Sequence, residues 1–115
     1  MGRKPDLTNV AKYADMFAAI GTEPRLRILR LLLSAFPNGM VVSDIQSGVA
    51  IPNSTLSHHL EKLKNEGLVT VRREGTFLWY SADAETLREL LQFLYAECCT
   101  KSGAVQPEAI IKVCS

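Results

Sequence analysis

The sequence predicts a mainly α-helical domain with one β-hairpin. Over most of the 115 residues, apolar side chains recur every three or four positions, as they do on amphipathic helices. Two segments break this period, LVTVRR and TFLWYS. Both are rich in β-branched and aromatic residues, and they meet around Glu74-Gly75, as the strands of a hairpin would. The length and the apolar fraction of 47% suit one domain with a modest core.

Two helices are predicted at the start of the domain. The first has an apolar face formed by Val10, Tyr13, Phe17 and Ile20. Gly21 ends this helix, Thr22 can cap the second, and Pro24 suits its first turn. The segment LRILRLLLSAF is apolar nearly all round, which predicts a central, buried helix. The turn Pro37-Asn38-Gly39 ends it.

A pair of shorter helices is predicted next. Ser43 and Gln46 match a capping box, which opens a short helix that ends near Gly48. Asn53 or Ser54 caps the following helix. That helix carries Leu56, Leu60 and Leu63 on one face. Gly67 supplies its C-terminal stop.

After the hairpin, a long helix is predicted from about Ala84. Its apolar stripe consists of Leu87, Leu90, Leu91, Leu94, Tyr95 and Cys98. A short helix, a turn, a second helix and then a hairpin describe a winged helix-turn-helix. The first and last helices both carry apolar stripes that a chain of 115 residues would struggle to cover, which favours a homodimer through these two helices.

The helix after the turn is a candidate for reading DNA. Its outer face begins with short hydrogen-bonding side chains, which can contact base edges or phosphates from the major groove. Adjacent arginines near the hairpin tip suit phosphates or the minor groove. The candidate DNA-binding residues are Asn53, Ser54, Thr55, Ser57, His58, Lys62, Arg72 and Arg73. Helix caps, a solvated face and a charged strand end are the alternatives. His59 lies nearer the leucines, which favours a packing role.

Charge and composition bound the function further. Basic residues outnumber acidic ones in residues 1–80, and the reverse holds in residues 81–115, a balance that permits phosphate binding by the first part. No Gly-rich phosphate loop or carboxylate constellation occurs, so we expect no enzyme. The sequence has no apolar run of the roughly 20 residues that span a bilayer, and its start lacks the apolar stretch of a signal peptide. We expect a cytoplasmic protein with reduced thiols.

Three segments resemble the ArsR/SmtB family of bacterial transcriptional repressors: TEPRLRILRLLL, PNSTLSHHLEKLKNEGLV and VRREGTFLWYSAD. The resemblance covers about residues 13–100. It implies a winged-helix homodimer, built on the first and last helices, that binds double-stranded operator DNA. It also implies a division into a DNA-binding and dimerisation domain, residues 1–100, and a C-terminal tail, residues 101–115. Members of the family sense zinc, cadmium, arsenite, persulfide and other signals.

The cysteines bear on which signal is sensed. The helix VSDIQSGV has no cysteine, and no histidine follows His59, so two of the family's metal-site types lack their ligands. The remaining pattern, with neighbouring cysteines at the end of the last helix and a third beyond it, resembles a branch of arsenite repressors. The resemblance implies that Cys98, Cys99 and Cys114 bind As(III), with Sb(III) as a related ligand, and that no organic cofactor is needed. Soft thiolates suit such centres.

Two alternatives stay open for these thiols. A redox or persulfide sensor, or a sensor of another metal such as cadmium, could use the same cysteines in the same fold. Cys98 is also in phase with the apolar stripe and could pack as a small apolar side chain.

Overall fold

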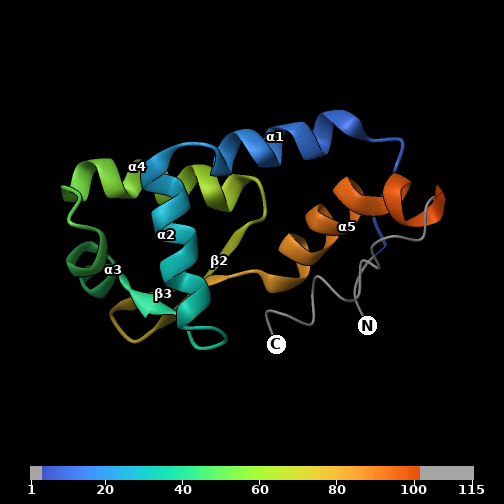
Figure 1. Ribbon diagram of the computed structural model, residues 1–115. Coiled ribbons are helices and arrows are strands. Elements are labelled where there is room, and N and C mark those ends of the chain that lie inside the picture. The colour runs from blue at the N-terminus through green and yellow to red at the C-terminus, as the bar shows by residue number, and fades with distance from the viewer. Residues whose placement is uncertain (1–3, 102–115) are drawn as a thin grey trace.

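The computed structural model describes residues 4–101, and of residues 97–101 it describes only the backbone. The elements are α1 (Val10–Ile20), α2 (Glu23–Ser34), β1 (Met40–Val41), α3 (Val42–Val49), α4 (Asn53–Asn65), β2 (Val69–Glu74), β3 (Phe77–Ala82) and α5 (Ala84–Lys101). Figure 1 shows α1 to α4 and the strands in one body, from which α5 projects. None of the helices described has both the length and the apolar character that a membrane span requires.

The winged helix-turn-helix prediction is confirmed. The helix α2 packs against α1, α3, α4 and β3, so its central position is as expected. It is buried on one side, through Ile28, Leu29 and Leu32, rather than all round, because Leu26 on its other side is 46% exposed. Thr22 caps this helix as predicted, since its side-chain oxygen accepts a hydrogen bond from the backbone N–H of Arg25.

The predicted inner face of α1 is partly wrong. Tyr13, Met16 and Ala19 are buried, whereas Val10 is 60% exposed and Phe17 is 36% exposed. The helix is therefore rotated relative to the expected stripe. Tyr13, Met16 and Ala19, which are three positions apart, face the core, and the face with Val10 and Phe17 is turned further toward the solvent.

Two predicted helix caps are also wrong. The helix α3 begins at Val42, its N-cap is Val41, and no side chain caps it, so Ser43 and Gln46 form no capping box. The reason is that Val41 still pairs with Trp79 in the sheet, and the chain enters the helix directly from β1. The helix α4 begins at Asn53 after Pro52, again without a side-chain cap, so neither Asn53 nor Ser54 is the N-cap.

The hairpin is confirmed, and a short third strand joins it. β2 and β3 pair antiparallel, with Arg72 opposite Trp79 and Glu74 opposite Phe77. β1, which the sequence pattern did not reveal, pairs with the other edge of β3, so the strand order is β1-β3-β2. A two-residue strand is too short to show a period of its own.

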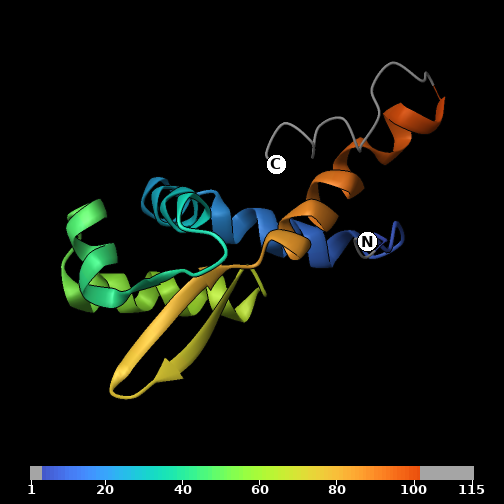
Figure 2. The ribbon, with the colours of Figure 1, turned by 90° about the horizontal axis from the view of Figure 1, so that it is seen from below.

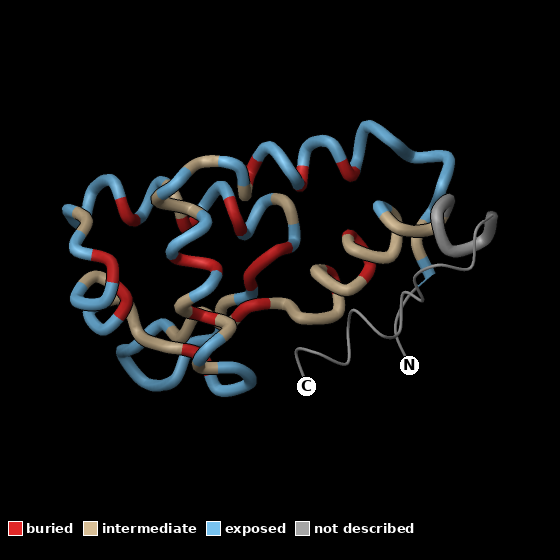
Figure 3. Tube along the Cα trace, viewed as in Figure 1, coloured by how far each residue is buried: buried red, intermediate tan, exposed pale blue. Residues whose placement is uncertain are grey.

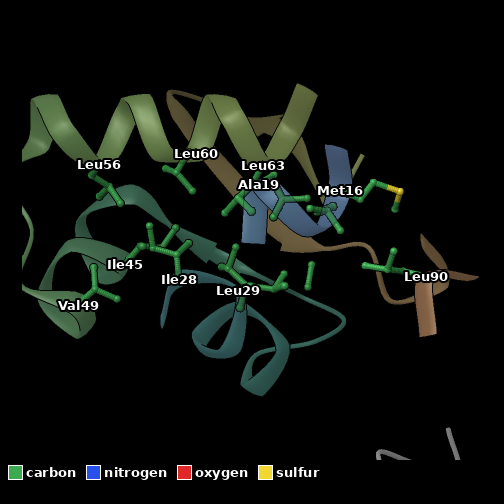
Figure 4. Close-up of a cluster of buried hydrophobic side chains, with 14 of the residues drawn as sticks. Met16, Ala19, Ile28, Leu29, Ile45, Val49, Leu56, Leu60, Leu63 and Leu90 are labelled. Carbon is green, nitrogen blue, oxygen red and sulfur yellow. The ribbon is translucent and has the colours of Figure 1, made fainter. Parts of the chain in front are cut away.

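The core lies between α4 and the other helices. Figure 4 shows Leu56, Leu60 and Leu63 of α4 pointing toward α1, α2 and α3. Figure 3 shows the buried positions spaced along the inner side of these helices, while α5 is mostly half-buried and contributes Leu90 to the core. This packing leaves the opposite side of α4 to the solvent.

Candidate nucleic-acid interface

The outer side of α4 gathers most of the predicted DNA-binding residues. The three leucines of this helix are buried almost completely, which fixes the rotation of the helix about its axis. The candidates Asn53, Ser54, Thr55, Ser57, His58 and Lys62 are all exposed. Because the apolar side of α4 is buried, its polar side faces the solvent, as reading of the major groove requires.

The start of α4 can bind an anion through its backbone. Ala50 adopts a left-handed conformation, with φ 56° and ψ 48°, and Pro52 is extended, so the chain turns sharply into the helix. Because no side chain caps the helix, the first N–H groups stay available for an external acceptor. A DNA phosphate is such an acceptor, and the helix dipole adds to its attraction.

Arg25 connects α4 to two other helices. Its Nε donates a hydrogen bond of 2.6 Å to the carbonyl oxygen of Ala19 at the end of α1. One terminal nitrogen, Nη1, lies 3.2 Å from Nδ1 of His59 on α4. A guanidinium can only donate, so Nδ1 of His59 is the acceptor and carries no proton. Arg25 therefore holds the candidate recognition helix against the helices beneath it.

His59 has the packing role that its position near the leucines predicted. The side chain is half-buried. Burial lowers the pKa of His59, and the positive charges of Arg25 and His58 lower it further. Sequence reasoning missed the role of Arg25, because its partner His59 lies 34 positions away in the chain and no local pattern indicates the contact.

Lys62 lies at the edge of the polar face nearest α1. It lines a surface cavity of about 220 Å³ together with Asp15, Ala18, Ala19, Arg25 and Glu66. Asp15 and Glu66 each bring a carboxylate to this cavity, so two acidic side chains line it together with Lys62.

The two wing arginines occupy different environments. As neighbours in a strand, Arg72 and Arg73 point to opposite faces of the hairpin. Nε of Arg72 donates to Oε2 of Glu74 at 2.8 Å, and its Nη1 donates to the carbonyl oxygen of Asn38 at 2.8 Å. The same guanidinium lies 5.1 Å from the centre of the Trp79 ring. Arg73 is exposed at the hairpin tip, opposite Leu78.

These contacts distinguish the predicted DNA-binding roles of Arg72 and Arg73. Part of the hydrogen-bonding capacity of Arg72 serves to hold the 37–39 turn against the wing. Arg73 is thus the better candidate for a phosphate at the tip.

The predicted thiol site lies largely beyond the described side chains. Cys98 and Cys99 occupy consecutive positions near the end of α5, and Cys114 lies outside the described residues. Consecutive helical residues point about 100° apart. Among the side chains that the structure describes, no three His, Cys, Asp or Glu residues gather closely enough to hold a metal ion.

The fold and the exposed face of α4 define the class of winged helix-turn-helix transcriptional regulators. The family described as "Bacterial regulatory protein, arsR family" matches residues 22–71. The chain is 35% identical to the transcriptional activator HlyU of Vibrio cholerae over 92 residues, which span 77% of this chain and 82% of HlyU. This chain belongs to the ArsR family.

Two other relatives have names that mention a ligand. The putative arsenical resistance operon repressor ArsR2 of Halobacterium salinarum is 33% identical, over 77% of this chain and 73% of its own length. The cadmium resistance transcriptional regulatory protein CadC homolog of Staphylococcus aureus is 32% identical, over 77% and 74%.

Solved structures agree on the fold. Reduced HlyU superposes with a TM-score of 0.61 at 34% identity, over 76% of this chain and 93% of the HlyU chain. A fragment of Mb0332 from Mycobacterium bovis, described as a homodimeric winged helix-turn-helix DNA-binding domain, gives 0.63 at 27% identity, over 91% and 94%.

Proposed function

We propose that this regulator is a homodimeric repressor that leaves its operator when arsenite or antimonite binds Cys98, Cys99 and Cys114. The observation that carries the proposal is the pair of neighbouring cysteines near the end of α5, one of the two predicted dimerisation helices. The relationship to an arsenical resistance repressor is in keeping with it. A ligand at these thiols would act on the helix that also joins the two subunits.

The homodimer is supported by exposed apolar side chains on the two outer helices. Val10 on α1 and Leu94 on α5 are 60% and 57% exposed within the described chain, and Phe17 on α1 is 36% exposed. A two-fold partner would remove these surfaces from water. It would also present two copies of α4 to a pseudo-palindromic operator, about one DNA turn apart.

DNA binding is supported by the exposed face and the uncapped start of α4. The exposed polar face can contact base edges, and the start of the helix can bind a phosphate. Arg73 at the wing tip can bind a second phosphate. The candidate residues remain predictions, with Arg72 already partly engaged by Glu74 and Asn38.

Thiolate chemistry supports the choice of ligand. Arsenous acid with three thiols gives an arsenic trithiolate and three water molecules, so no oxidant or reductant is needed. Soft thiolates favour such a centre over hard cations, whereas zinc prefers four ligands. Consecutive positions of an α-helix lie about 100° apart, so binding of one arsenic by both cysteines would require the backbone at the end of α5 to rearrange.

The test is release of DNA measured by fluorescence anisotropy. The probe is a labelled duplex that the purified protein selects from a random-sequence pool, and arsenite is added anaerobically without a competing thiol. We expect the parent protein to dissociate and the Cys98→Ser/Cys99→Ser variant to stay bound. The site assignment is wrong if both proteins dissociate at the same arsenite concentration. Cys114→Ser tests the third ligand separately.

A thiol redox sensor is the second candidate. HlyU, a relative at 35% identity, has a solved structure described as its reduced form. In the same assay, release by diamide and not by arsenite would favour redox sensing. Release by cadmium alone would favour the other metal-sensing alternative.

A further inference from the structure

A buried carboxylate joins α1 to α5. Glu89 on α5 is 4% exposed, and it is the one buried charged side chain among those described. The hydroxyl of Tyr13 donates a hydrogen bond of 2.6 Å to Oε2 of Glu89, and Nζ of Lys12 donates one of 2.8 Å to the same oxygen. Burying a carboxylate is costly unless donors compensate it, so these contacts specify one relative position of the two helices.

Tyr13 extends this connection in two directions. Its ring is fully buried and stacks on Phe93 of α5, with centroids 4.2 Å apart. Its hydroxyl also accepts a hydrogen bond of 2.9 Å from the backbone N–H of Asp6, in the segment before α1. Burial raises the pKa of Tyr13, and the hydrogen bond to Glu89 raises it further, so the hydroxyl keeps its proton and continues to donate at neutral pH.

Within the described chain, α5 meets the other helices mainly at α1, where Lys12, Tyr13 and Glu89 form the joint between the two helices. Figure 2 shows α5 leaving the body at an angle, with α1 crossing near its base. Of the helices, α1 is the one that α5 packs against most closely, and α1 in turn packs on α2 and α4. A tilt of α5 is therefore passed to α4 chiefly through the residues that join α5 to α1.

We infer that the Lys12–Tyr13–Glu89 joint stabilises the DNA-binding arrangement and couples it to the end of α5. This inference rests on the proposed function. Cys98 follows Glu89 by about two and a half helical turns, so a rearrangement at the thiols acts on the joint through one continuous helix. The DNA-binding arrangement keeps the hydrogen bonds of Glu89, and the arsenic-bound arrangement loosens them.

Thermodynamic linkage between DNA binding and arsenite binding predicts how variants of the joint behave. Loosening the joint favours the arsenic-bound arrangement, so it must weaken DNA binding and strengthen arsenite binding together. Damage to the fold alone would weaken both. The direction of the arsenite effect thus distinguishes coupling from a merely structural role.

The test compares Tyr13→Phe with the parent protein. This change removes the hydroxyl and keeps the ring that stacks on Phe93. We expect about tenfold weaker binding to the selected duplex and arsenite binding tighter by up to about tenfold, a size typical of coupled sites. Arsenite affinity is measured by calorimetry without DNA, and thermal unfolding checks that the variant is folded.

Two further variants sharpen the test. Glu89→Gln keeps an acceptor for Tyr13 but removes the charge that Lys12 pairs with, so we expect a smaller change in the same directions. Arg27→Gln is the matched control, because it breaks the exposed ion pair of Arg27 with Glu23, 2.6 Å long, away from the joint. We expect it to bind DNA and arsenite as the parent does.

Two results would overturn the inference. One is unchanged DNA affinity of folded Tyr13→Phe, and the other is weaker binding of both DNA and arsenite. If the parent protein binds the duplex but ignores arsenite, the proposed function fails. DNA binding then still tests the joint, because unchanged affinity of folded Tyr13→Phe overturns its role, and weaker binding by a variant with the parent's unfolding temperature supports it.

Discussion

At the scale of single residues, the buried leucines of α4 and the contact between Arg25 and His59 position the candidate DNA-binding surface. Burial, and then the charge of Arg25, lowers the pKa of His59, and the leucines of α4 fix which side chains face outward. Neither contribution requires DNA, so each can be tested on the free protein.

His59 should make the stability of the protein depend on pH. Its pKa is lowered from 6.5 in the folded protein, so the unfolded chain binds a proton at a higher pH than the folded one does. Protons thus favour unfolding, and the free energy of unfolding should fall as the pH drops from about 7 through the lowered pKa. Urea unfolding at several pH values measures this slope.

We expect His59→Gln, which still offers Arg25 an acceptor, to flatten this part of the pH profile. His58→Gln is the control, since His58 is exposed, and it should keep most of the slope. An unaltered slope in His59→Gln would assign the pH dependence to other groups.

Leu60 should carry a large share of the packing energy under α4. It is 1% exposed between α4 and the other helices, so Leu60→Ala leaves a cavity and should cost about 2–5 kcal/mol in the free energy of unfolding. Leu26→Ala, at a position 46% exposed, should cost under about 1 kcal/mol. Chemical denaturation measures both, and similar costs would mean that the core is not centred on α4.

At the scale of elements, the turn between α2 and β1 depends on the absence of a side chain at Gly39. This residue has φ 86°, and a Cβ there would clash with the carbonyl oxygen of Tyr80 and with Oγ of Ser81. Gly67, at φ 75° after α4, has open space around it. Both positions favour glycine by conformation, but only Gly39 also lies against the sheet.

Alanine should therefore be much worse tolerated at Gly39 than at Gly67. We expect Gly67→Ala to cost about 1–2 kcal/mol for its left-handed backbone alone. Gly39→Ala adds the clash with β3, and it should cost clearly more and loosen the wing. Thermal unfolding compares the two variants. Equal midpoints would show that the turn can move away from Tyr80 without loss.

The two arginines of the wing should differ in how they affect DNA binding. Arg73 is exposed at the tip, so Arg73→Gln should remove one phosphate contact per subunit and lower the steepness of the salt dependence by about 0.9 per contact. Arg72→Gln should act more weakly on this slope, because Arg72 is held by Glu74 and Asn38. Anisotropy titrations at several salt concentrations measure the slopes. The reverse order would assign the phosphate contact to Arg72.

At the scale of the whole molecule, the exposed apolar residues of α1 and α5 predict a dimer that a single charge can break. Leu94 is 57% exposed on α5, and Leu94→Glu should shift the protein toward monomer, because the carboxylate would have to be buried at the interface. Sedimentation equilibrium measures the change. Leu26→Glu on α2 should leave the association as it is, and a parent protein that sediments as a monomer would refute the dimer.

Much of this architecture could be read from local patterns. The order of the helices, the hairpin, the Thr22 cap and the stop at Gly67 follow from side-chain period and from residues with strong backbone preferences, which act over a few positions. The leucine face of α4, and hence its exposed polar face, follows from the same period. The resemblance in three segments predicts the family, and the match of residues 22–71 to the arsR family confirms it.

What the sequence determined by itself is thus the fold class, the outward face of α4 and the presence of three thiols near the C-terminus. Tertiary structure alone decided the rotation of α1, the short strand β1, the uncapped starts of α3 and α4, and the partners of Arg25, Arg72 and Glu89. Those features depend on contacts between residues far apart in the chain. Tyr13 and Glu89, for example, are 76 positions apart, and no local pattern encodes their meeting.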